Sequence, residues 1–431
     1  MSDPRVGKPE EGTHLSSGSG SGENLPSRSK LLALTSFCHL VNDGTGFFVP
    51  VAAALLTTNR GFSPFEIIVI FVIYYISTTL LGPFVGRFSD RTGKPALLMA
   101  LGMVLLGTGL VGLYLSLAVL LGVASMVSAS VAAFILGFGA SFYHPLGATL
   151  LQQNIPRENL GSALGINGAM GSLGRALYPF LYFAATLALL ENYMVLVFAF
   201  LGILSGAIVI ESLGNLSALS IRAAPGKAPE ARKVLSRSMV LLTIISFLRF
   251  ASTQGVIAWL PIYMVTTHFT TPAELGIVVT LLYVGGILGQ PFFGRFFGQF
   301  DTRIVLGVTT AGSTLTALAF LWTGGVVALA LLFLLGFFTF SAFPQLMTLT
   351  LEYSESGSTS LANSLVYGLG TGAGNAVGPL LVGVISGNHY GNLIYGFYVM
   401  ITLGVFTAFA VGFMPKPRNT VKTSASVNRA A

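Results

Sequence analysis

The sequence predicts an all-α polytopic membrane protein with twelve transmembrane helices, arranged as two six-helix pseudo-symmetric bundles. Three observations lead to this prediction. The 431 residues are 53% hydrophobic and only 9% charged, so charge is too scarce to cover a soluble globule of this size. Apolar stretches of about 20 residues, the length that spans a bilayer, recur from near residue 31 to near residue 414. Finally, the second half of the chain repeats motifs of the first.

The apolar stretches are predicted to be helices, because residues such as those of 96–114 are apolar on every face, whereas barrel strands alternate polar and apolar residues. The first six predicted helices cover residues 31–58, 64–86, 96–116, 119–152, 158–190 and 192–214. The second six cover residues 238–267, 272–294, 303–322, 325–351, 359–386 and 391–414.

These helices divide the chain into domains. Residues 31–215 form the N-terminal six-helix bundle and residues 238–414 form the C-terminal bundle, with a polar cytoplasmic linker at 216–237. Residues 1–30 are rich in Ser, Gly, Pro and charge and lack the apolar core of a signal peptide, so we expect a disordered cytoplasmic tail. Residues 415–431 form a second cytoplasmic tail.

The two halves match at nearly constant offsets. Gly174 and Pro179 correspond to Gly374 and Pro379 at an offset of 200. Further matches occur in two other helix pairs: Gly137, Phe138 and Pro145 with Gly336, Phe337 and Pro344 at 199, and Pro83, Gly86 and Arg87 with Pro291, Gly294 and Arg295 at 208. Six helices per copy is an even number, so the copies share one orientation and meet at a central interface.

The distribution of basic residues predicts the topology. With twelve crossings, 19 of the 22 Lys and Arg residues fall on the side that holds both termini and the linker, and the opposite side has only Arg60. By the positive-inside rule both termini are cytoplasmic, and we expect a location in the plasma or inner membrane. The remaining two, Arg175 and Arg249, fall inside helices and need another explanation.

Several functional classes are disfavoured. The formal charge of +7 is spread over short loops and tails instead of one basic face, so we expect no nucleic-acid partner. Cys38 is the only cysteine, and we identify no metal-ligand cluster in the sequence. The glycines near Gly370 lie in an apolar helix with no Walker lysine, which argues against ATP hydrolysis. We therefore expect neither an enzyme nor a cofactor other than a proton gradient.

The segment after the second predicted helix contains a glycine, then Asp-Arg, then Gly and a basic residue: Gly86, Asp90, Arg91, Gly93 and Lys94. This segment resembles the signature loop of the major facilitator superfamily. The resemblance covers residues 31–414 and implies that these five residues act as a conformational latch that steadies the outward-facing state. A plain topology-determining loop is the alternative.

A finer resemblance rests on residues 39–43 (HLVND) and 142–148 (FYHPLGA), which are similar to the fosmidomycin-resistance branch of efflux carriers. Proton antiporters of the superfamily often carry a Gly-Pro pair in the fifth helix. Here Tyr178 precedes Pro179, and the pair occurs instead in the eleventh helix, as Gly378 and Pro379. The direction of coupling therefore stays open.

Asp43 is the only acidic residue placed centrally in a predicted helix, and His39 lies one turn before it on the same face. A charge at the bilayer centre costs about 2.5 to 3.5 kcal/mol, so such residues usually face a cavity and serve a function. We therefore predict Asp43 as the proton-coupling residue and His39 as its modulator. A purely structural hydrogen bond from Asp43 to a neighbouring helix is the alternative.

Arg175 and Arg249 lie near the middle of helices five and seven, in different halves. Together they outnumber Asp43 by one charge, so an anionic substrate could be held between them. Superfamily carriers of organic phosphates and carboxylates resemble this arrangement. Alternatively, one arginine pairs with Asp43 and leaves the other as the sole anion contact.

His144, Gln254 and Trp259 are further candidates. His144 is a predicted substrate contact that lines the inner vestibule or assists proton transfer. The alternative is a local hydrogen bond beside Pro145, which is expected to kink its helix. Gln254 is a predicted substrate contact. Trp259 is either a substrate contact or an interfacial anchor.

These observations predict a proton-coupled secondary active transporter that moves a small organic anion by alternating access. A drug or antibiotic efflux antiporter is the alternative, and a transporter-like solute sensor is the third possibility. The expected partners are a small anionic solute and the lipid bilayer, and we expect a monomer.

Overall fold

The computed structural model describes residues 27–213, 236–267, 271–294, 296, 300–353, 362 and 364–416. Nearly all of the predicted N-terminal tail (1–30), linker (216–237) and C-terminal tail (415–431) lies outside these residues.

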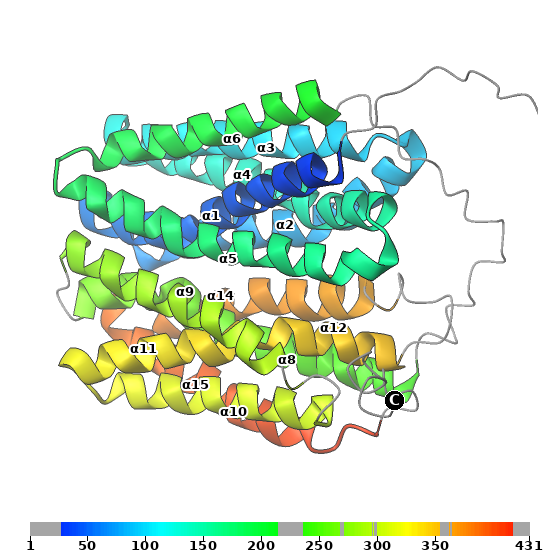
Figure 1. Ribbon diagram of the computed structural model, residues 1–431. Helices are drawn as coiled ribbons and strands as arrows, with labels where there is room; N and C mark the ends of the chain where they lie inside the picture. The colour runs from blue at the N-terminus through cyan, green and yellow to red at the C-terminus, as the bar shows by residue number, and fades with distance from the viewer. Residues whose placement is uncertain are drawn as a thin grey trace, which may run out of the picture.

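The described chain is helical throughout both halves (Figure 1). The first half consists of α1 (Arg28–Arg60), α2 (Pro64–Thr92), α3 (Pro95–Tyr114) with the π-turn η1 (Leu115–Val119), α4 (Gly122–Asn154), α5 (Arg157–Thr186) and α6 (Glu191–Leu213). The second half consists of α8 (Arg237–Thr267), α9 (Pro272–Gly294), α10 (Thr302–Leu321), α11 (Gly325–Thr339) with α12 (Ala342–Tyr353), η2 (Ser364–Gly372) with α14 (Ala373–Ser386), and η3 (Tyr390–Asn392) with α15 (Leu393–Val411).

The helix packing repeats between the halves. In the first half α1 packs on α5, α2 on α4, and α3 on both α4 and α6. In the second half α8 packs on α14, α9 on α11, and α10 on both α11 and α15, which is the same pattern one repeat later. The two bundles lie one above the other in Figure 1. The predicted fold class is therefore confirmed.

The repeat extends to the way helices begin. Ser63 caps α2 in a capping box with Glu66, in which the Ser63 amide donates to Glu66 Oε2 at 2.8 Å. The Thr271 amide donates to Glu274 Oε2, also at 2.8 Å, before α9. Thr271 and Glu274 follow Ser63 and Glu66 at the same offset of 208 that relates the other end of these helices. Each box satisfies amides that have no partner inside the helix.

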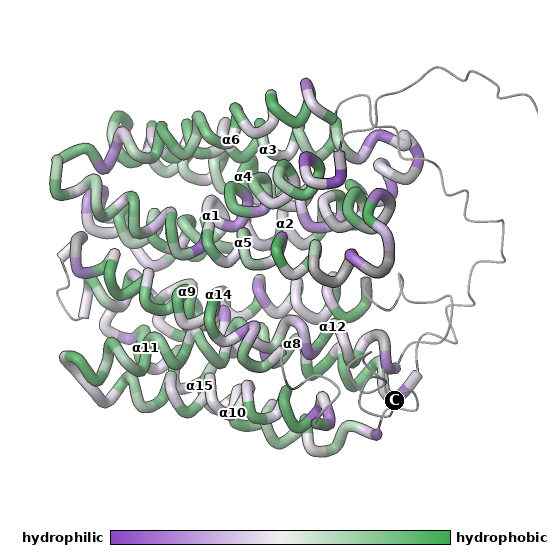
Figure 2. The backbone as a smooth tube through the Cα atoms, in the orientation of Figure 1, coloured by the Kyte–Doolittle hydropathy of each residue, from purple (hydrophilic) through white to green (hydrophobic). Residues whose placement is uncertain are grey.

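The surface of both bundles is suited to lipid. Large apolar side chains such as Leu80, Phe200 and Phe409 are exposed along the helices, and the tube is mostly green along its length in Figure 2. Eleven of the described helical segments are long and apolar enough to cross a membrane. The twelfth is α5, which carries Arg175 and Asn167 and is packed between α1 and α9. The internal position of α5 explains its lower hydropathy.

The halves meet through α5 against α9, α2 against α14 and α1 against α8. Five hydrogen bonds between described residues join them. Thr57 pairs with Tyr390 at 3.1 Å, and the Tyr390 hydroxyl donates to the Phe62 carbonyl. Gln254 donates to Tyr75 at 2.6 Å, Thr79 donates to the Gly372 carbonyl at 3.1 Å, and Gln290 donates to Ser172 at 3.3 Å. Apolar contacts also cross the interface, among them the ring pairs Phe71 with Trp259 and Phe47 with Tyr283, both at a centroid distance of 5.3 Å.

Two predicted helix boundaries are wrong. The second helix does not end at residue 86 but continues to Thr92, where Gly93 ends it at a φ of 63°. A helix does not need apolar residues once it leaves the membrane. The helix predicted over 325–351 is broken at Phe340 and Ser341. Pro344 has no amide to donate to the Phe340 carbonyl, and its ring crowds that carbonyl, so the break lies four residues before the proline. The matching Pro145 leaves α4 as one uninterrupted helical segment.

Candidate functional site

Asp43 lies in the middle of α1 and is only 6% exposed. Its carboxylate contacts three basic side chains from three helices. His39 Nε2 lies 3.4 Å from Oδ2, His144 Nε2 lies 3.5 Å from Oδ1, and Arg175 Nε lies 3.8 Å from Oδ2. Asn42 also donates to Oδ1 at 3.0 Å. We call Asp43, His39, His144 and Arg175 the charge cluster.

Two glycines of α5 allow the charge cluster to form. A Cβ at Gly174 would lie 2.0 Å from the Leu40 carbonyl oxygen, and a Cβ at Gly171 would lie 2.5 Å from His39 Nε2. Only glycine permits this separation of α1 and α5. The close approach places Arg175, the residue after Gly174, beside Asp43.

The ring of His39 is oriented by residues that the sequence analysis did not identify. Its Nδ1 lies 2.8 Å from the backbone oxygen of Asn167 and 2.9 Å from the Asn167 side-chain oxygen. A backbone oxygen only accepts hydrogen bonds, so Nδ1 carries a proton and donates. The ring also stacks on Tyr143 at a centroid distance of 4.7 Å, and Tyr143 in turn donates to the Thr35 carbonyl at 2.9 Å.

This orientation fixes what His39 presents to Asp43. With Nδ1 protonated, neutral His39 has only a lone pair on Nε2, and a lone pair facing carboxylate oxygen at 3.4 Å is repulsive. The contact is favourable only when a cation stands between the two atoms. A proton shared by His39 and Asp43 is the simplest such cation.

His144 approaches Asp43 from α4, and its side chain is 59% exposed. Nε2 therefore faces the carboxylate, and much of the remaining side chain is exposed. This arrangement favours the vestibule-lining alternative for His144 over the purely local one. Pro145, which follows it, produces no break in α4.

Arg175 connects the charge cluster to the second half. Its guanidinium lies over the rings of Phe47 and Phe340, at 5.2 and 5.1 Å from their centroids, and it donates to Ser172 at 2.6 Å. Phe340 belongs to the break between α11 and α12. Cation–π contacts of this kind stabilise a guanidinium while leaving its edge free for an anion.

Arg249 is on α8 and is only 1% exposed. It donates to the Thr310 hydroxyl at 3.1 Å and to the carbonyls of Phe338 and Thr339 at 3.4 and 3.1 Å. All three partners belong to the second half, and the two carbonyls precede the break in the helix. The two arginines therefore reach neighbouring residues of this break, although only Arg175 contacts Asp43.

Gln254 and Trp259 lie further along α8. Gln254 is 8% exposed and its amide donates to Tyr75 across the interface between the halves. Trp259 is fully buried and donates to the Pro379 carbonyl at 2.8 Å. Trp259 is therefore not at the lipid interface, and the prediction of an interfacial anchor is wrong.

The predicted latch residues span the end of α2. Gly86 lies within the helix, Arg91 is exposed in its last turn, Gly93 ends it, and Lys94 precedes α3. Asp90 is also in α2, and its side chain lies outside the described part of the chain. Arg91 near a helix C-terminus is favourable for the helix dipole. The latch role itself stays a prediction.

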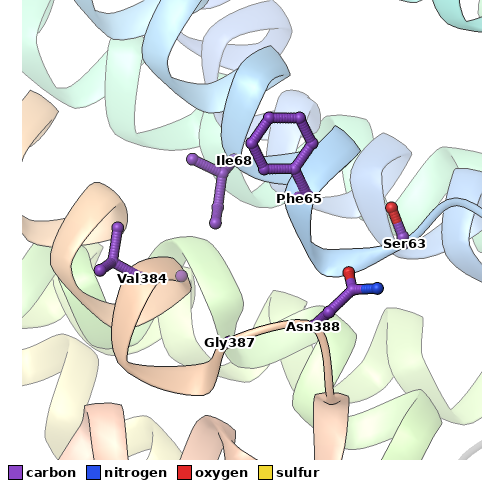
Figure 3. A pocket seen from close by; sticks show the side chains of 7 residues that line it. Ser63, Phe65, Ile68, Val384, Gly387 and Asn388 are labelled. Atoms are coloured by element: carbon purple, nitrogen blue, oxygen red, sulfur yellow. The ribbon is translucent and has the colours of Figure 1, made fainter.

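A groove of about 510 Å³ opens between α2 and α14 (Figure 3). It shares no residue with the charge cluster. It is lined by Ser63, Phe65, Ile68, Gly383, Val384, Gly387 and Asn388. Its lining is mainly apolar and lies on the seam between the halves. None of the predicted site residues lines it.

Comparison with known proteins identifies the family. The model of the Major Facilitator Superfamily matches residues 32–365 and 242–430. The Fosmidomycin resistance protein of Escherichia coli (strain K12) is 24% identical over 395 residues, covering 88% of this chain and 92% of that relative. The Protein TsgA homolog of Yersinia enterocolitica is 25% identical over 263 residues, covering 60% of this chain and 64% of that relative.

Solved structures support the same conclusion about the fold. A D-xylose-proton symporter aligns with a TM-score of 0.70 at 16% identity, over 91% of this chain and 99% of the symporter. An inward-facing bacterial homolog of the human lysosomal transporter Spinster also aligns with a TM-score of 0.70, at 14% identity, over 92% of this chain and 97% of the homolog. The predicted resemblances are confirmed: the chain belongs to the major facilitator superfamily and is a multi-pass membrane transporter, not an enzyme.

Proposed function

We propose that this protein is a proton-coupled secondary active transporter of a small organic anion, with the charge cluster as its coupling site. The observation that carries the proposal is the contact between His39 Nε2 and Asp43 Oδ2, because with Nδ1 bonded to the Asn167 carbonyl a proton shared by the two atoms makes this contact favourable. The site thus offers a place for an exchangeable proton next to a guanidinium.

The charges of the cluster couple this proton to an anion. Without the proton, Asp43 neutralises Arg175. With the proton shared between Asp43 and His39, the cluster carries one net positive charge, which an anion can neutralise at Arg175. Other ionisable groups near the carboxylate are Tyr74 on α2 and Tyr143 on α4, and Tyr283 of α9 lies near Arg175. These are neutral at physiological pH, so they do not change the sign of the argument.

Proton and anion binding therefore support each other, which favours movement of both in one direction. The alternative is an efflux antiporter, and the similarity to the Fosmidomycin resistance protein supports it. In that case the proton and the substrate would compete for the cluster. A transporter-like sensor is a third possibility. In each case we propose cytoplasmic termini, a monomer and no cofactor besides the proton gradient.

The proposal is tested by a ligand screen followed by transport. Purified full-length protein is screened against anionic, neutral and cationic metabolites and antibiotics by thermal shift, since a ligand at 100 times its Kd stabilises the fold by about 2.7 kcal/mol. Ligands that bind are then followed in proteoliposomes under an imposed pH gradient. We expect anions to bind and the gradient to drive their flux. Selective binding of cations, or flux that ignores the gradient, contradicts the proposal.

The roles of the two arginines can be separated. Arg175→Gln is expected to weaken anion affinity by roughly 10- to 100-fold, because a hydrogen bond to a charged group contributes about 1.5 to 3 kcal/mol. Arg249→Gln tests the predicted clamp. If Arg249 also contacts substrate, affinity falls by a similar factor. If it only stabilises the break in the helix, the melting temperature falls instead. Normal binding by both variants contradicts the anion assignment.

A further inference from the structure

Three ligand atoms converge in the charge cluster at distances suited to a metal ion. His39 Nε2 and Asp43 Oδ2 are 3.4 Å apart, His144 Nε2 and Asp43 Oδ1 are 3.5 Å apart, and all three groups offer ligand atoms within 4.8 Å of one another. A tetrahedral zinc site with bonds of about 2.0 to 2.1 Å has ligand-to-ligand edges of about 3.3 to 3.4 Å. Each imidazole thus lies at about this distance from one oxygen of the Asp43 carboxylate, His39 from Oδ2 and His144 from Oδ1. With one ligand atom taken from each residue, all separations are within 4.8 Å.

The surroundings of His39 match those of a metal-binding histidine. Such a residue usually donates its other ring nitrogen to a carbonyl or carboxylate, which directs the free lone pair at the ion. His39 does this through Nδ1 and the Asn167 carbonyl. Stacking on Tyr143 holds the plane of the ring. The lone pair of Nε2 therefore points at the carboxylate, where a cation is required.

The solvent exposure of the site and its set of ligand groups also fit a metal ion. Asp43 and His39 are buried or nearly so, while His144 is 59% exposed and opens the site to solvent. Two imidazoles and one carboxylate are suited to zinc, copper, cobalt or nickel and not to magnesium or calcium, which prefer oxygen ligands. A fourth position would be left for water.

We propose that His39, Asp43 and His144 form a binding site for a divalent transition-metal ion. Arg175 opposes the ion, since its guanidinium lies 3.8 Å from Asp43 Oδ2 and carries a positive charge. Removal of this charge strengthens metal binding, whereas it weakens anion binding. Metal binding itself does not depend on the proposed function. Only its expected consequence, inhibition of flux by an ion at the position of the coupling proton, rests on that function.

The test uses full-length protein that carries no polyhistidine tag. Co²⁺ is titrated and followed by its visible absorption, and bound Cu²⁺ is examined by electron paramagnetic resonance for coupling to imidazole nitrogens. Wild type is expected to bind one ion with two coupled nitrogens. His144→Ala should lower affinity at least 10-fold and reduce the pattern to one nitrogen. Asp43→Asn should also lower affinity at least 10-fold, and Arg175→Gln should raise it several-fold.

His389→Ala is the matched control, because His389 is an exposed histidine in the segment before η3. It should bind metal as wild type does. A 10-fold loss in His389→Ala, or wild-type affinity and two coupled nitrogens in His144→Ala, refutes the site. His144→Gln is a second variant for the case that His144→Ala misfolds, because glutamine is closer to histidine in volume than alanine is. It should show the same single-nitrogen pattern. A site present in the wild type but with unaltered flux would support metal binding and contradict only the inhibition that rests on the proposed function.

Discussion

Asp43→Asn is expected to abolish proton-driven flux while the protein still binds its substrate. The substitution keeps the shape of the side chain and its position near His39 and Asn42, but it removes the negative charge that can share a proton with His39. Without that charge, a proton on His39 is opposed by Arg175 and has no counterion. The measurement is solute flux in proteoliposomes with and without a pH gradient, together with ligand-induced thermal shift in detergent.

Glu211→Gln is the matched control for this experiment, because Glu211 is an acidic residue at the exposed end of α6. It removes one negative charge without touching the charge cluster, and flux should stay at the wild-type level. If Asp43→Asn retains its response to the pH gradient, Asp43 is not the coupling residue. The structural alternative, a carboxylate that only joins α1 to its neighbours, would then hold.

Gly174→Ala is expected to lower the stability of the first bundle more than any other single methyl group added to α5. The new Cβ would lie 2.0 Å from the Leu40 carbonyl oxygen, which is a backbone atom and cannot rotate away. Overpacking of a core costs about 1 to 3 kcal/mol, and we expect the upper part of that range. The displacement of α1 would also separate Asp43 from Arg175. Thermal unfolding and substrate binding should therefore both be impaired.

Gly168→Ala is the control on the same helix. A Cβ at Gly168 meets nothing within 4 Å, so the melting temperature should be unchanged or slightly raised by the better helix propensity of alanine. Equal stability of Gly174→Ala and Gly168→Ala would show that α1 and α5 are not packed as closely as this structure has them.

The fold could be predicted from the sequence because it follows from local patterns and from the repeat. Helix length and polarity follow from the bilayer, and the even repeat of six helices sets the relation of the halves. Even the capping pair Thr271 and Glu274 repeats Ser63 and Glu66 at the offset seen elsewhere in the same helix pair. Such features need no knowledge of which helices touch.

The predicted helix boundaries were wrong where hydropathy carries no information about the backbone conformation. The end of α2 at Thr92 is set by a glycine with positive φ, well beyond the last apolar residue. The break before Pro344 and the intact helix around Pro145 arise from prolines at matching positions of the repeat. In the second half Arg249 donates to carbonyls next to the break, so a tertiary contact accompanies the difference.

Part of the candidate site was also visible in the sequence. Asp43, His39 and Arg175 stood out because ionisable groups are rare in spanning helices, and the structure brings these three together with His144. Asn167, Tyr143 and Phe340 did not stand out. Each is an ordinary residue in its own helix and gains its importance only from what it faces. Asn167 and His39 are 128 residues apart in the sequence, so no local sequence pattern indicates their contact.

The sequence by itself therefore determined the membrane location, the twelve-helix repeat and the scarce buried charges, because lipid penalises every unneeded polar group along a spanning helix. Only the tertiary structure decided which charges are partners. It placed Arg175 beside Asp43, it gave Arg249 hydrogen-bond partners in the second bundle, and it fixed the tautomer of His39 through the Asn167 carbonyl. Those outcomes depend on how closely α1 and α5 approach, and that distance is set by side chains on two helices at once.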